Sequence, residues 1–319
     1  MSLPPRIELP GGRRAGAHLP VGMGLLRVAE RAAEIGASAL QIFSDNPTAW
    51  RRRTETPPEA AAFRQRLDDL DLRPVAIHAA YLVNLAGPDD ELFGRSVEMI
   101  RHELAHASEL GARFVNLHTG SHRGAGIEAG IARLVDGLER ATDGTLSDPD
   151  APLVVLENSS GGGFTIGSTI EELATVLEAA AARGLDGNLA ICLDVAHLWG
   201  AGYEVSRPEA IDRLLEETDR KIGLDKLAMI HLNDSLSALG SRRDHHTHLG
   251  EGQIGRIGLA HFLRHPALSG AAFYLETPGM EKGFDAVNMA RLGDLAEDRP
   301  LTPAPVAEGR PQLDTGAME

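Results

Sequence analysis

The sequence predicts an α/β protein: a single (β/α)8 TIM barrel with its active site at the C-terminal ends of the strands. Eight short apolar segments of strand character alternate with longer segments of helical periodicity. Such alternation is typical of a parallel sheet covered by helices. The 319 residues give the length that a barrel of eight units needs, and 43% hydrophobic residues suffice for a large core.

The eight predicted strands are spread over the body of the chain. In order, they are Arg14–His18, Ala39–Phe43, Val75–His78, Phe114–His118, Leu153–Glu157, Leu189–Asp194, Leu227–His231 and Ala272–Glu276. No repeat or linker divides them, so we expect one barrel domain over residues 13–298, preceded by an N-terminal arm of residues 1–12. Residues 299–319 are polar and rich in proline and glycine, and we expect them to be disordered.

Each of the last six predicted strands ends on a side chain that can bind a metal ion. These residues are His78, His118, Glu157, Asp194, His231 and Glu276. The C-terminal ends of barrel strands meet at one face, so residues about two hundred positions apart would share a cleft. A ring of polar groups there is costly unless something binds it. We therefore expect a metal site at this face.

Two further segments add candidate ligands. His197 follows Asp194 by three residues, and the stretch DHHTH contributes Asp244 and His246 after the seventh strand. Imidazole combined with carboxylate favours zinc, with manganese or iron as alternatives, over magnesium or calcium. Nine candidate ligands are too many for one tetrahedral ion, so the sequence indicates a cluster of two or three ions.

The charge and the cysteine content limit the function classes. A formal net charge of −15 argues against a nucleic-acid partner, but bound metal ions would neutralise several acids, and arginines cluster at 13–14, 51–53 and 242–243. These arginines could equally be ordinary solvated surface. The chain has one cysteine, Cys192, so it cannot form an internal disulfide. Because Cys192 lies in the apolar segment LAICLD, we expect a buried thiol. With no export signal and no apolar run of membrane-spanning length, we expect a cytoplasmic protein without a membrane partner.

The segment HELAH, residues 102–106, matches the H-E-x-x-H motif of zinc proteases. It lies in the middle of the helical pattern SVEMIRHELAHASELG. The barrel prediction places that helix in the outer ring, away from the strand ends. We therefore interpret the motif as a chance match.

Several longer motifs follow one another at barrel-strand spacing. They are NLHTGSH (116–122), VVLENSSGGGFTIG (154–167), ICLDVAHLWGAGY (191–203), MIHLNDS (229–235), RDHHTHLGEGQIG (243–255) and YLETPG (274–279). With GAH (16–18) and IHAAYLVNLAGP (77–88), they resemble the endonuclease IV family of apurinic/apyrimidinic endonucleases. The resemblance extends from about Gly16 to Asp298.

The resemblance implies a barrel with three zinc ions, one of which could be replaced by Mn²⁺. It assigns His78 and His118 to the first ion, Glu157 as a bridge to the second, Asp194, His231 and Glu276 to the second, and His197, Asp244 and His246 to the third. Glu157 would then be the catalytic carboxylate that positions a metal-bound hydroxide. The implied reaction is hydrolysis of the phosphodiester 5′ to an abasic site in double-stranded DNA. It leaves a 3′-hydroxyl and a 5′-deoxyribose phosphate in base excision repair, and the implied enzyme is a monomer.

The same resemblance suggests DNA contacts. Tyr81 and Leu82 match residues that fill the gap left by a flipped nucleotide, although they could instead be apolar anchors of their loop. In SDNPTAWRRR (44–53), Thr48 stands where the family has a basic residue, so the candidates for a DNA contact are Arg51, Arg52 and Arg53. His245 is a further candidate for a phosphate contact, whereas His248 is given no role.

The main alternative is a sugar isomerase or epimerase on the same kind of barrel. Glu157, Asp194, His231 and Glu276 could hold the single divalent ion of such an enzyme, but His197, Asp244 and His246 would have no use there. A Schiff-base mechanism is disfavoured because none of the three lysines, Lys221, Lys226 and Lys282, stands at a strand C-terminus. A non-enzymatic DNA- or metal-binding module would not need a ring of ligands open to a substrate.

Overall fold

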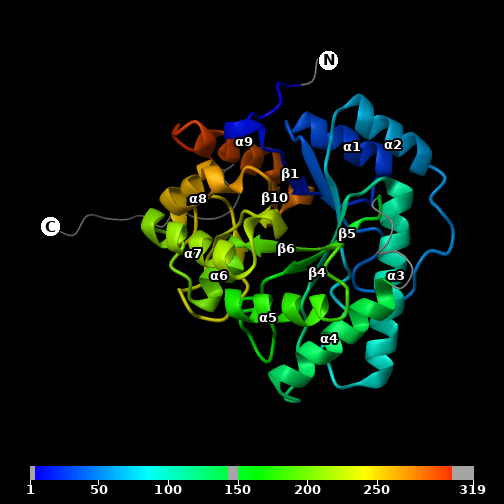
Figure 1. Cartoon of the computed structure of the whole chain (residues 1–319). Helices are drawn as coiled ribbons and strands as arrows, with labels where there is room; N and C mark the ends of the chain where they lie inside the picture. Colours follow the sequence, from blue (N-terminus) through cyan, green and yellow to red (C-terminus); the bar gives the residue numbers. More distant parts are fainter. Residues whose placement is uncertain (1–3, 143–149, 304–319) are drawn as a thin grey trace, which may run out of the picture.

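The eight predicted strands form a closed parallel barrel. A computed structural model describes residues 4–142 and 150–303 (Figure 1). The strands are β1 (Ala15–His18), β2 (Ala39–Ile42), β3 (Val75–His78), β4 (Phe114–His118), β5 (Leu153–Glu157), β6 (Leu189–Asp194), β7 (Leu227–His231) and β10 (Ala272–Leu275). They pair in sequence order, and β1 closes the barrel against β10. The prediction of a TIM barrel is confirmed.

The helices surround the barrel, as Figure 1 shows. They are α1 (Leu25–Glu34), α2 (Ala60–Asp69), α3 (Asp90–Leu110), α4 (Ile127–Thr142), α5 (Ile170–Ala181), α6 (Val195–Ala201), α7 (Pro208–Lys221), α8 (Gly255–Arg264) and α9 (Phe284–Ala296). Their ends follow local rules: Asp89 accepts a hydrogen bond from the Leu92 amide at the start of α3, and Gly111 ends α3 at φ 70°.

Two apolar layers hold the barrel together. The larger layer lies between the strands and the helices, and residues such as Val28, Phe63 and Leu134 are buried in it. A smaller cluster gathers the alternate side chains of the strands, including Phe114, Met229, Tyr274 and Cys192. The sequence prediction that Cys192 is buried is confirmed, and burial raises the pKa of its thiol to about 12.

The ends of the described chain pack on the barrel. Leu9 of the N-terminal arm is buried, and the Ile7 amide donates to the Gly36 carbonyl at 2.9 Å. We expected disorder from Arg299 onward, but the Thr302 amide donates to Asp294 Oδ2 at 2.7 Å, so residues 299–303 are attached to α9. The rest of the predicted tail, residues 304–319, lies outside the described residues.

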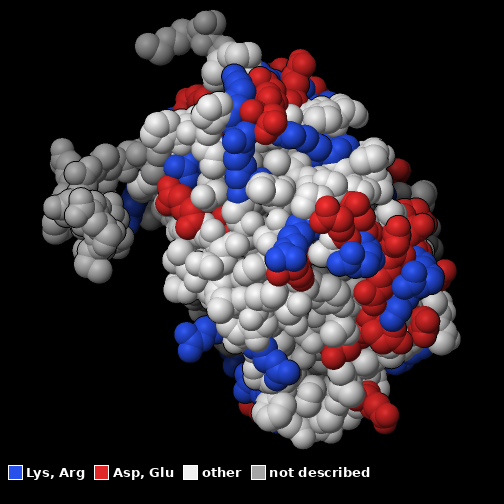
Figure 2. All heavy atoms as spheres, turned by 90° about the vertical axis from the view of Figure 1, so that its left-hand side faces the viewer, with Lys and Arg blue, Asp and Glu red and all other residues white. Residues whose placement is uncertain are grey.

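The surface is mixed in charge. Figure 2 looks onto the side that carries α7 and α8, where acidic side chains gather on one side of a broad uncharged area. In the part of the chain that the structure describes, no helix combines the length and apolarity that crossing a membrane requires.

Candidate metal centre

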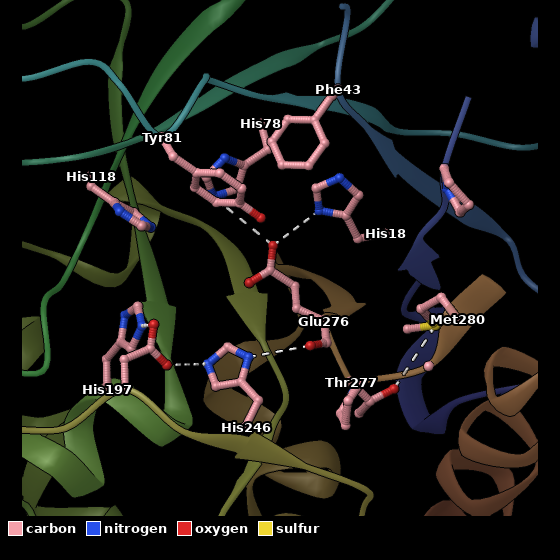
Figure 3. A pocket seen from close by; sticks show the side chains of 14 residues that line it. His18, Phe43, His78, Tyr81, His118, His197, His246, Glu276, Thr277 and Met280 are labelled. Carbon is pink, nitrogen blue, oxygen red and sulfur yellow. Dashed lines mark hydrogen bonds and ion pairs between the residues drawn. The ribbon is translucent and has the colours of Figure 1, made fainter. Parts of the chain in front are cut away.

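A cleft of about 410 Å³ opens where the strands end. Figure 3 shows its lining, and the side chains at its base come from β1, β3, β4 and the residues just after β10. The lining includes His18, Phe43, His78, Tyr81, His118, His197, Asp244, His246 and Glu276. Segments far apart in the sequence therefore meet at one face, as parallel barrel strands require.

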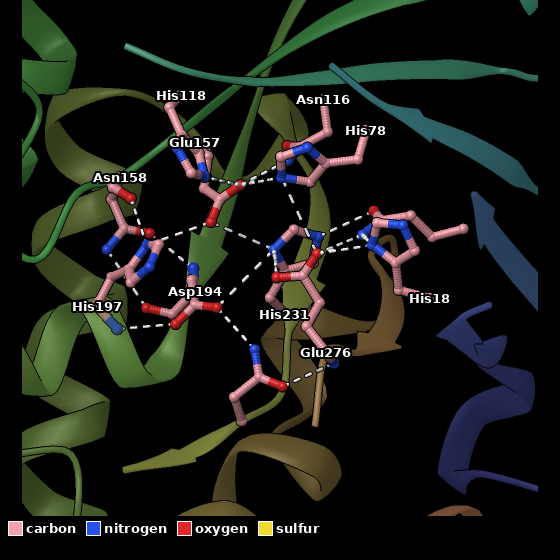
Figure 4. A network of polar contacts seen from close by, with 12 residues as sticks. His18, His78, Asn116, His118, Glu157, Asn158, Asp194, His197, His231 and Glu276 are labelled. Carbon is pink, nitrogen blue, oxygen red and sulfur yellow. Dashed lines mark hydrogen bonds and ion pairs between the residues drawn. The ribbon is translucent and has the colours of Figure 1, made fainter. Parts of the chain in front are cut away.

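The nine candidate ligands predicted from the sequence lie together in and below this cleft. Figure 4 shows the seven that come from β3 to β7, the start of α6 and the end of β10, and Figure 3 shows His246. Glu157 is at their centre. The Nε2 atoms of His78 and His118 both lie 3.6 Å from Glu157 Oε2. One donor atom of each of these three residues lies within 4.8 Å of the other two, so they form a first group that could hold a metal ion.

A second group shares Glu157 and lies deeper. His231 Nδ1 is 3.3 Å from the other carboxylate oxygen, Glu157 Oε1, and 3.2 Å from Glu276 Oε2. Asp194 Oδ2 completes the group at 3.8 Å from His231 Nδ1. The sheet register explains this proximity, because Asp194 and His231 are direct neighbours on β6 and β7.

A third group begins where β6 turns into α6. Asp194 caps α6 by accepting from the His197 amide at 2.7 Å, so the helix start fixes His197 beside the strand end. His246 lies in β9 (His246–Thr247), a two-residue strand paired with β8 (Asp234–Ser235). Asp244 joins the group, since its Oδ2 is 3.2 Å from His197 Nε2 and its Oδ1 is 3.0 Å from His246 Nε2.

The buried atoms of these groups fit bound cations. Glu157 Oε1, His231 Nδ1 and His246 Nε2 are buried and form no hydrogen bond of acceptable geometry, although each lies 3.0–3.3 Å from an oppositely charged or polar atom of the site. Burial alone would raise the pKa of Glu157, but the imidazoles around it, His231 first, hold that pKa well below its usual range. Burial disfavours the charged ring of His246, and Asp194 and Asp244 outweigh it and raise its pKa to about 9. The carboxylates thus attract protons to the imidazoles, and metal ions would displace those protons.

A layer of buried amides orients the carboxylates, and the sequence prediction missed it. Asn116 Nδ2 donates to Glu157 Oε2 at 2.5 Å, and Asn233 Nδ2 donates to Asp194 Oδ2 at 2.7 Å. Gln41 donates to Glu276 Oε1 at 2.6 Å, while its own oxygen lies 3.0 Å from His231 Nε2. Partners of this kind fix the orientation of metal ligands. The strand pattern carries a signal for Asn116 and Gln41, because both are polar residues inside otherwise apolar strands.

His18 is a further cleft residue absent from the predicted set. It ends β1 just as the predicted ligands end their strands, and its Nδ1 lies 3.2 Å from Glu276 Oε1. Its Nε2 is buried without a partner. The signal was available in the sequence, since the first predicted strand also ends on a histidine.

The loop that carries Asp244 and His246 is attached through Asp234. This buried carboxylate accepts hydrogen bonds from the amides of Gly250 and Gly252, both at 3.0 Å, and of Ile254 at 3.1 Å. The approach is so close that a Cβ on Gly252 would lie 2.3 Å from Asp234 Oδ1. The Asp234 carboxylate therefore holds the segment HLND (231–234) against the segment GEG (250–252).

Two aromatic side chains line the entrance of the cleft. Tyr81 is 60% exposed, and its ring packs edge-on against Phe43 at 5.2 Å between centroids. Leu82 beside it is half-buried. Burial, followed by the charge of Glu276, raises the pKa of Tyr81 to about 12, so its hydroxyl keeps its proton near neutral pH.

The three loop arginines differ in what they can contact. Arg51 and Arg53 are exposed. The Arg52 side chain is only 9% exposed, and its Nη1 donates to the Asn46 and Ala49 carbonyls at 2.8 Å. Expecting a DNA contact from Arg52 is therefore inconsistent with this geometry, because its guanidinium holds its own loop together.

His245 and His248 flank the third group without joining it. His245 is exposed. The His248 ring stacks on Phe284 at 4.7 Å, and its Nδ1 lies 3.0 Å from Asn288 Nδ2. His248 thus fastens the loop to α9.

The HELAH motif lies on α3 in the outer ring, as predicted. His102 and His106 stack with ring centroids 3.9 Å apart, and His102 Nε2 lies 2.8 Å from the Arg53 carbonyl. Glu103 faces inward, where it accepts a hydrogen bond from Ser44. Among the described residues, no metal-binding group of three includes this motif.

Comparisons with known proteins agree with this arrangement. A family model described as a xylose isomerase-like TIM barrel matches residues 29–300. A protein of Haloquadratum walsbyi named probable endonuclease 4 is 38% identical over 284 residues, which cover 89% of this chain and 98% of that protein. A protein of the same name from Halothermothrix orenii is 35% identical over 283 residues, covering 87% and 99%.

Solved structures show the same relation. Endonuclease IV from Thermus thermophilus superimposes with a TM-score of 0.78 at 36% identity, covering 89% of this chain and 99% of that one. A D-tagatose 3-epimerase-like protein, with a TM-score of 0.62 and 19% identity over 89% of this chain and 97% of that one, shares the fold alone. The chain therefore belongs to the endonuclease IV family of enzymes.

Proposed function

We propose that the chain is a zinc-dependent apurinic/apyrimidinic endonuclease of base excision repair. It hydrolyses the phosphodiester 5′ to an abasic site in double-stranded DNA and leaves a 3′-hydroxyl and a 5′-deoxyribose phosphate. The observation that carries the proposal is the sharing of Glu157 between the first and second ligand groups, with Asp194 of the second group only 3.5 Å from His246 of the third. Cations held side by side suit a phosphodiester, whose negative charge must be neutralised at both the attacking and the leaving oxygen. Relatives named endonuclease 4 support the same assignment.

The residues present fit three ions. His78, His118 and Glu157 would hold the first, Glu157, Asp194, His231 and Glu276 the second, and His197, Asp244 and His246 the third. Zinc bound there would lower the pKa of water towards about 7 and neutralise phosphate charge. The mixed donor set also admits Mn²⁺ at one site.

Glu157 is the proposed catalytic carboxylate. Asn116 fixes its Oε2, while Oε1 is buried and has no hydrogen-bond partner. Because its lowered pKa keeps this carboxylate ionised, it could serve both ligand groups and also accept a hydrogen bond from the attacking water. No side-chain nucleophile is required, and the single thiol, Cys192, is buried and keeps its proton.

Lesion recognition is assigned to the rim of the cleft. A cavity of about 410 Å³ suits a sugar phosphate, and flipping is less costly at a nucleotide that has lost its base. Tyr81 and Leu82 would fill the gap left in the duplex, while Arg51, Arg53 and His245, all exposed, would contact phosphates. We propose that the enzyme acts as a cytoplasmic monomer.

The test is incubation with a duplex that carries one abasic site, with and without a chelator. We expect a single incision with a 3′-hydroxyl at the nick, and no incision after chelation. No incision by the metal-loaded protein would overturn the proposal. Metal stoichiometry separates it from the sugar isomerase alternative: we expect near three ions per chain, whereas one ion would favour the isomerase.

A further inference from the structure

Two histidines and one aspartate converge outside the cleft, in the outer helical layer. His261 lies in α8, His265 caps its C-terminus, and Asp212 lies in α7. We propose that these three side chains form a separate site for a divalent transition-metal ion, with Zn²⁺ favoured by the donor set, that links α7 to the end of α8. The site is independent of the proposed nuclease reaction.

The donor atoms already face one another. Asp212 Oδ1 lies 2.6 Å from His261 Nε2 and 3.3 Å from His265 Nε2, and one donor atom of each residue lies within 4.8 Å of the other two. Tetrahedral zinc with bonds of about 2.0–2.2 Å keeps its ligands roughly 3.4 Å apart. The imidazole nitrogens therefore need only small side-chain rotations to bind one ion with the carboxylate.

The sequence explains why the two imidazoles meet. Residues four apart on a helix lie on one face, one turn from each other, and the two rings stand 5.3 Å apart at 70°. The side chains of Asp212, His261 and His265 are 47%, 28% and 18% exposed. They are thus held by their surroundings yet reachable by solvent, which leaves space for water as a fourth ligand.

One existing contact opposes the ion. His265 Nδ1 accepts a hydrogen bond from the Ala267 amide, and an ion on Nε2 would shift the ring proton to Nδ1 and break that bond. The bond is long, at 3.3 Å, so its loss is small beside a metal–imidazole bond. The charge of α7 favours a cation, since this helix, on the face seen in Figure 2, carries five acidic and three basic side chains, whereas the charge of Arg13 near His265 opposes it.

The HELAH histidines have the same spacing and serve as an internal contrast. Near His106 the Glu109 carboxylate stays 3.9 Å away, and Glu103 faces inward to Ser44. Within the described ranges, a group of three donors outside the barrel mouth occurs only at Asp212, His261 and His265. Both histidine pairs have the same four-residue spacing, but in the described part of the chain only His261 and His265 have a third donor, Asp212, within reach.

The test uses the full-length protein with its barrel-mouth site saturated with zinc and free metal removed. Calorimetric titration with Zn²⁺ should show one further ion, and excess Zn²⁺ should raise the Tm by about 5 °C. His261→Gln and, separately, Asp212→Asn should weaken this binding at least about tenfold and abolish the Tm rise. His122→Gln, which changes another surface histidine, is the matched control and should bind as the unsubstituted protein does.

Two results would overturn the site. One is the absence of any ion beyond those at the barrel mouth. The other is a further ion that His261→Gln and Asp212→Asn both retain. Because the readouts are metal uptake and Tm, neither depends on whether the protein cleaves abasic DNA.

Discussion

Two clusters in this molecule are built from the same residue types, histidine and a carboxylate, but their side chains are arranged differently. At the strand ends, imidazole nitrogens from β3, β4 and β7 lie within 3.6 Å of the Glu157 carboxylate on β5. On α3, the HELAH segment places two imidazoles in a stack and turns Glu103 to the opposite side. Because the barrel topology sums contributions from many strands, convergence in space identifies a metal centre better than a short motif does.

Removing the shared carboxylate should have the largest effect. Glu157→Ala deprives two ligand groups of their common member, so we expect loss of more than one ion and a fall in incision on the order of 10³-fold. Metal analysis and abasic-site incision measure the two effects together. Retention of full metal content would contradict the central place of Glu157.

Removing one ligand of the third group should be more selective. His246→Ala should lower metal content by one ion and remove most of the activity, because Asp244 and His197 lose their partner. The control is His248→Ala, two residues away and stacked on Phe284, which should keep metal and activity. Equal losses in both variants would mean that the loop, and not the ligand, is responsible.

The amides behind the ligands should matter less than the ligands themselves. Gln41→Ala leaves Glu276 and His231 without their orienting partner, and Asn116→Ala does the same to Glu157. We expect losses of about 10–100-fold in metal affinity or activity. Competition with a chelator of known affinity measures the first quantity, and wild-type affinity in both variants would show that these contacts are dispensable.

Glu103 of the HELAH segment should affect how the stability of the protein depends on pH, and it should not affect catalysis. Burial raises the pKa of Glu103 from 4.5 to about 7, so the folded protein holds this proton where the unfolded chain has released it. The stability from this group is complete below pH 4.5 and is lost as the pH rises through 7. The loss amounts to about 3 kcal/mol.

The side chain of the Glu103→Gln variant cannot ionise, so this loss should be absent from the variant. The difference in free energy of unfolding between the variant and the wild type should therefore rise by about 3 kcal/mol, in favour of the variant, between pH 4.5 and 7. Denaturant unfolding of both proteins across this range measures the difference, and other titrating groups cancel in the comparison. A difference that does not change with pH would show that Glu103 ionises normally in the folded protein.

The HELAH histidines should have the smallest effect. We expect the double variant His102→Ala/His106→Ala to retain its metal content and its incision rate, since neither ring lines the cleft. A fall in zinc content would instead make this helix part of a metal site and weaken the contrast with the strand ends.

The fold followed from the sequence because apolar strands and polar strand ends are local patterns. The predicted strands differ from the observed ones by one residue at most, as at Ala15, Ile42 and Leu275. The gathering of the candidate ligands followed in turn, since topology converts strand ends into neighbours. Their roles as ligands stay a prediction that the variants above test.

What the sequence could not supply depends on side-chain direction. Arg52 sits between two exposed arginines yet turns inward, and only the carbonyls of its own loop explain why. The sequence marks Gln41 and His18 as polar residues of apolar strands, but it does not encode that both contact Glu276 from two other strands. Residues 299–303 resemble a disordered tail in composition, but the contact between Thr302 and Asp294 attaches them to α9.

The connection through Asp234 has a consequence for how the centre assembles. Closing the barrel brings together the ligands at the strand ends, but Asp244 and His246 arrive only when the segment up to Ile254 folds onto Asp234. The candidate ligands therefore come from two sources. Most stand at the ends of the barrel strands, whereas Asp244 and His246 stand on a short loop. Mutations confined to this loop can therefore add or remove the third ligand group, while the strands that stabilise the barrel stay unchanged.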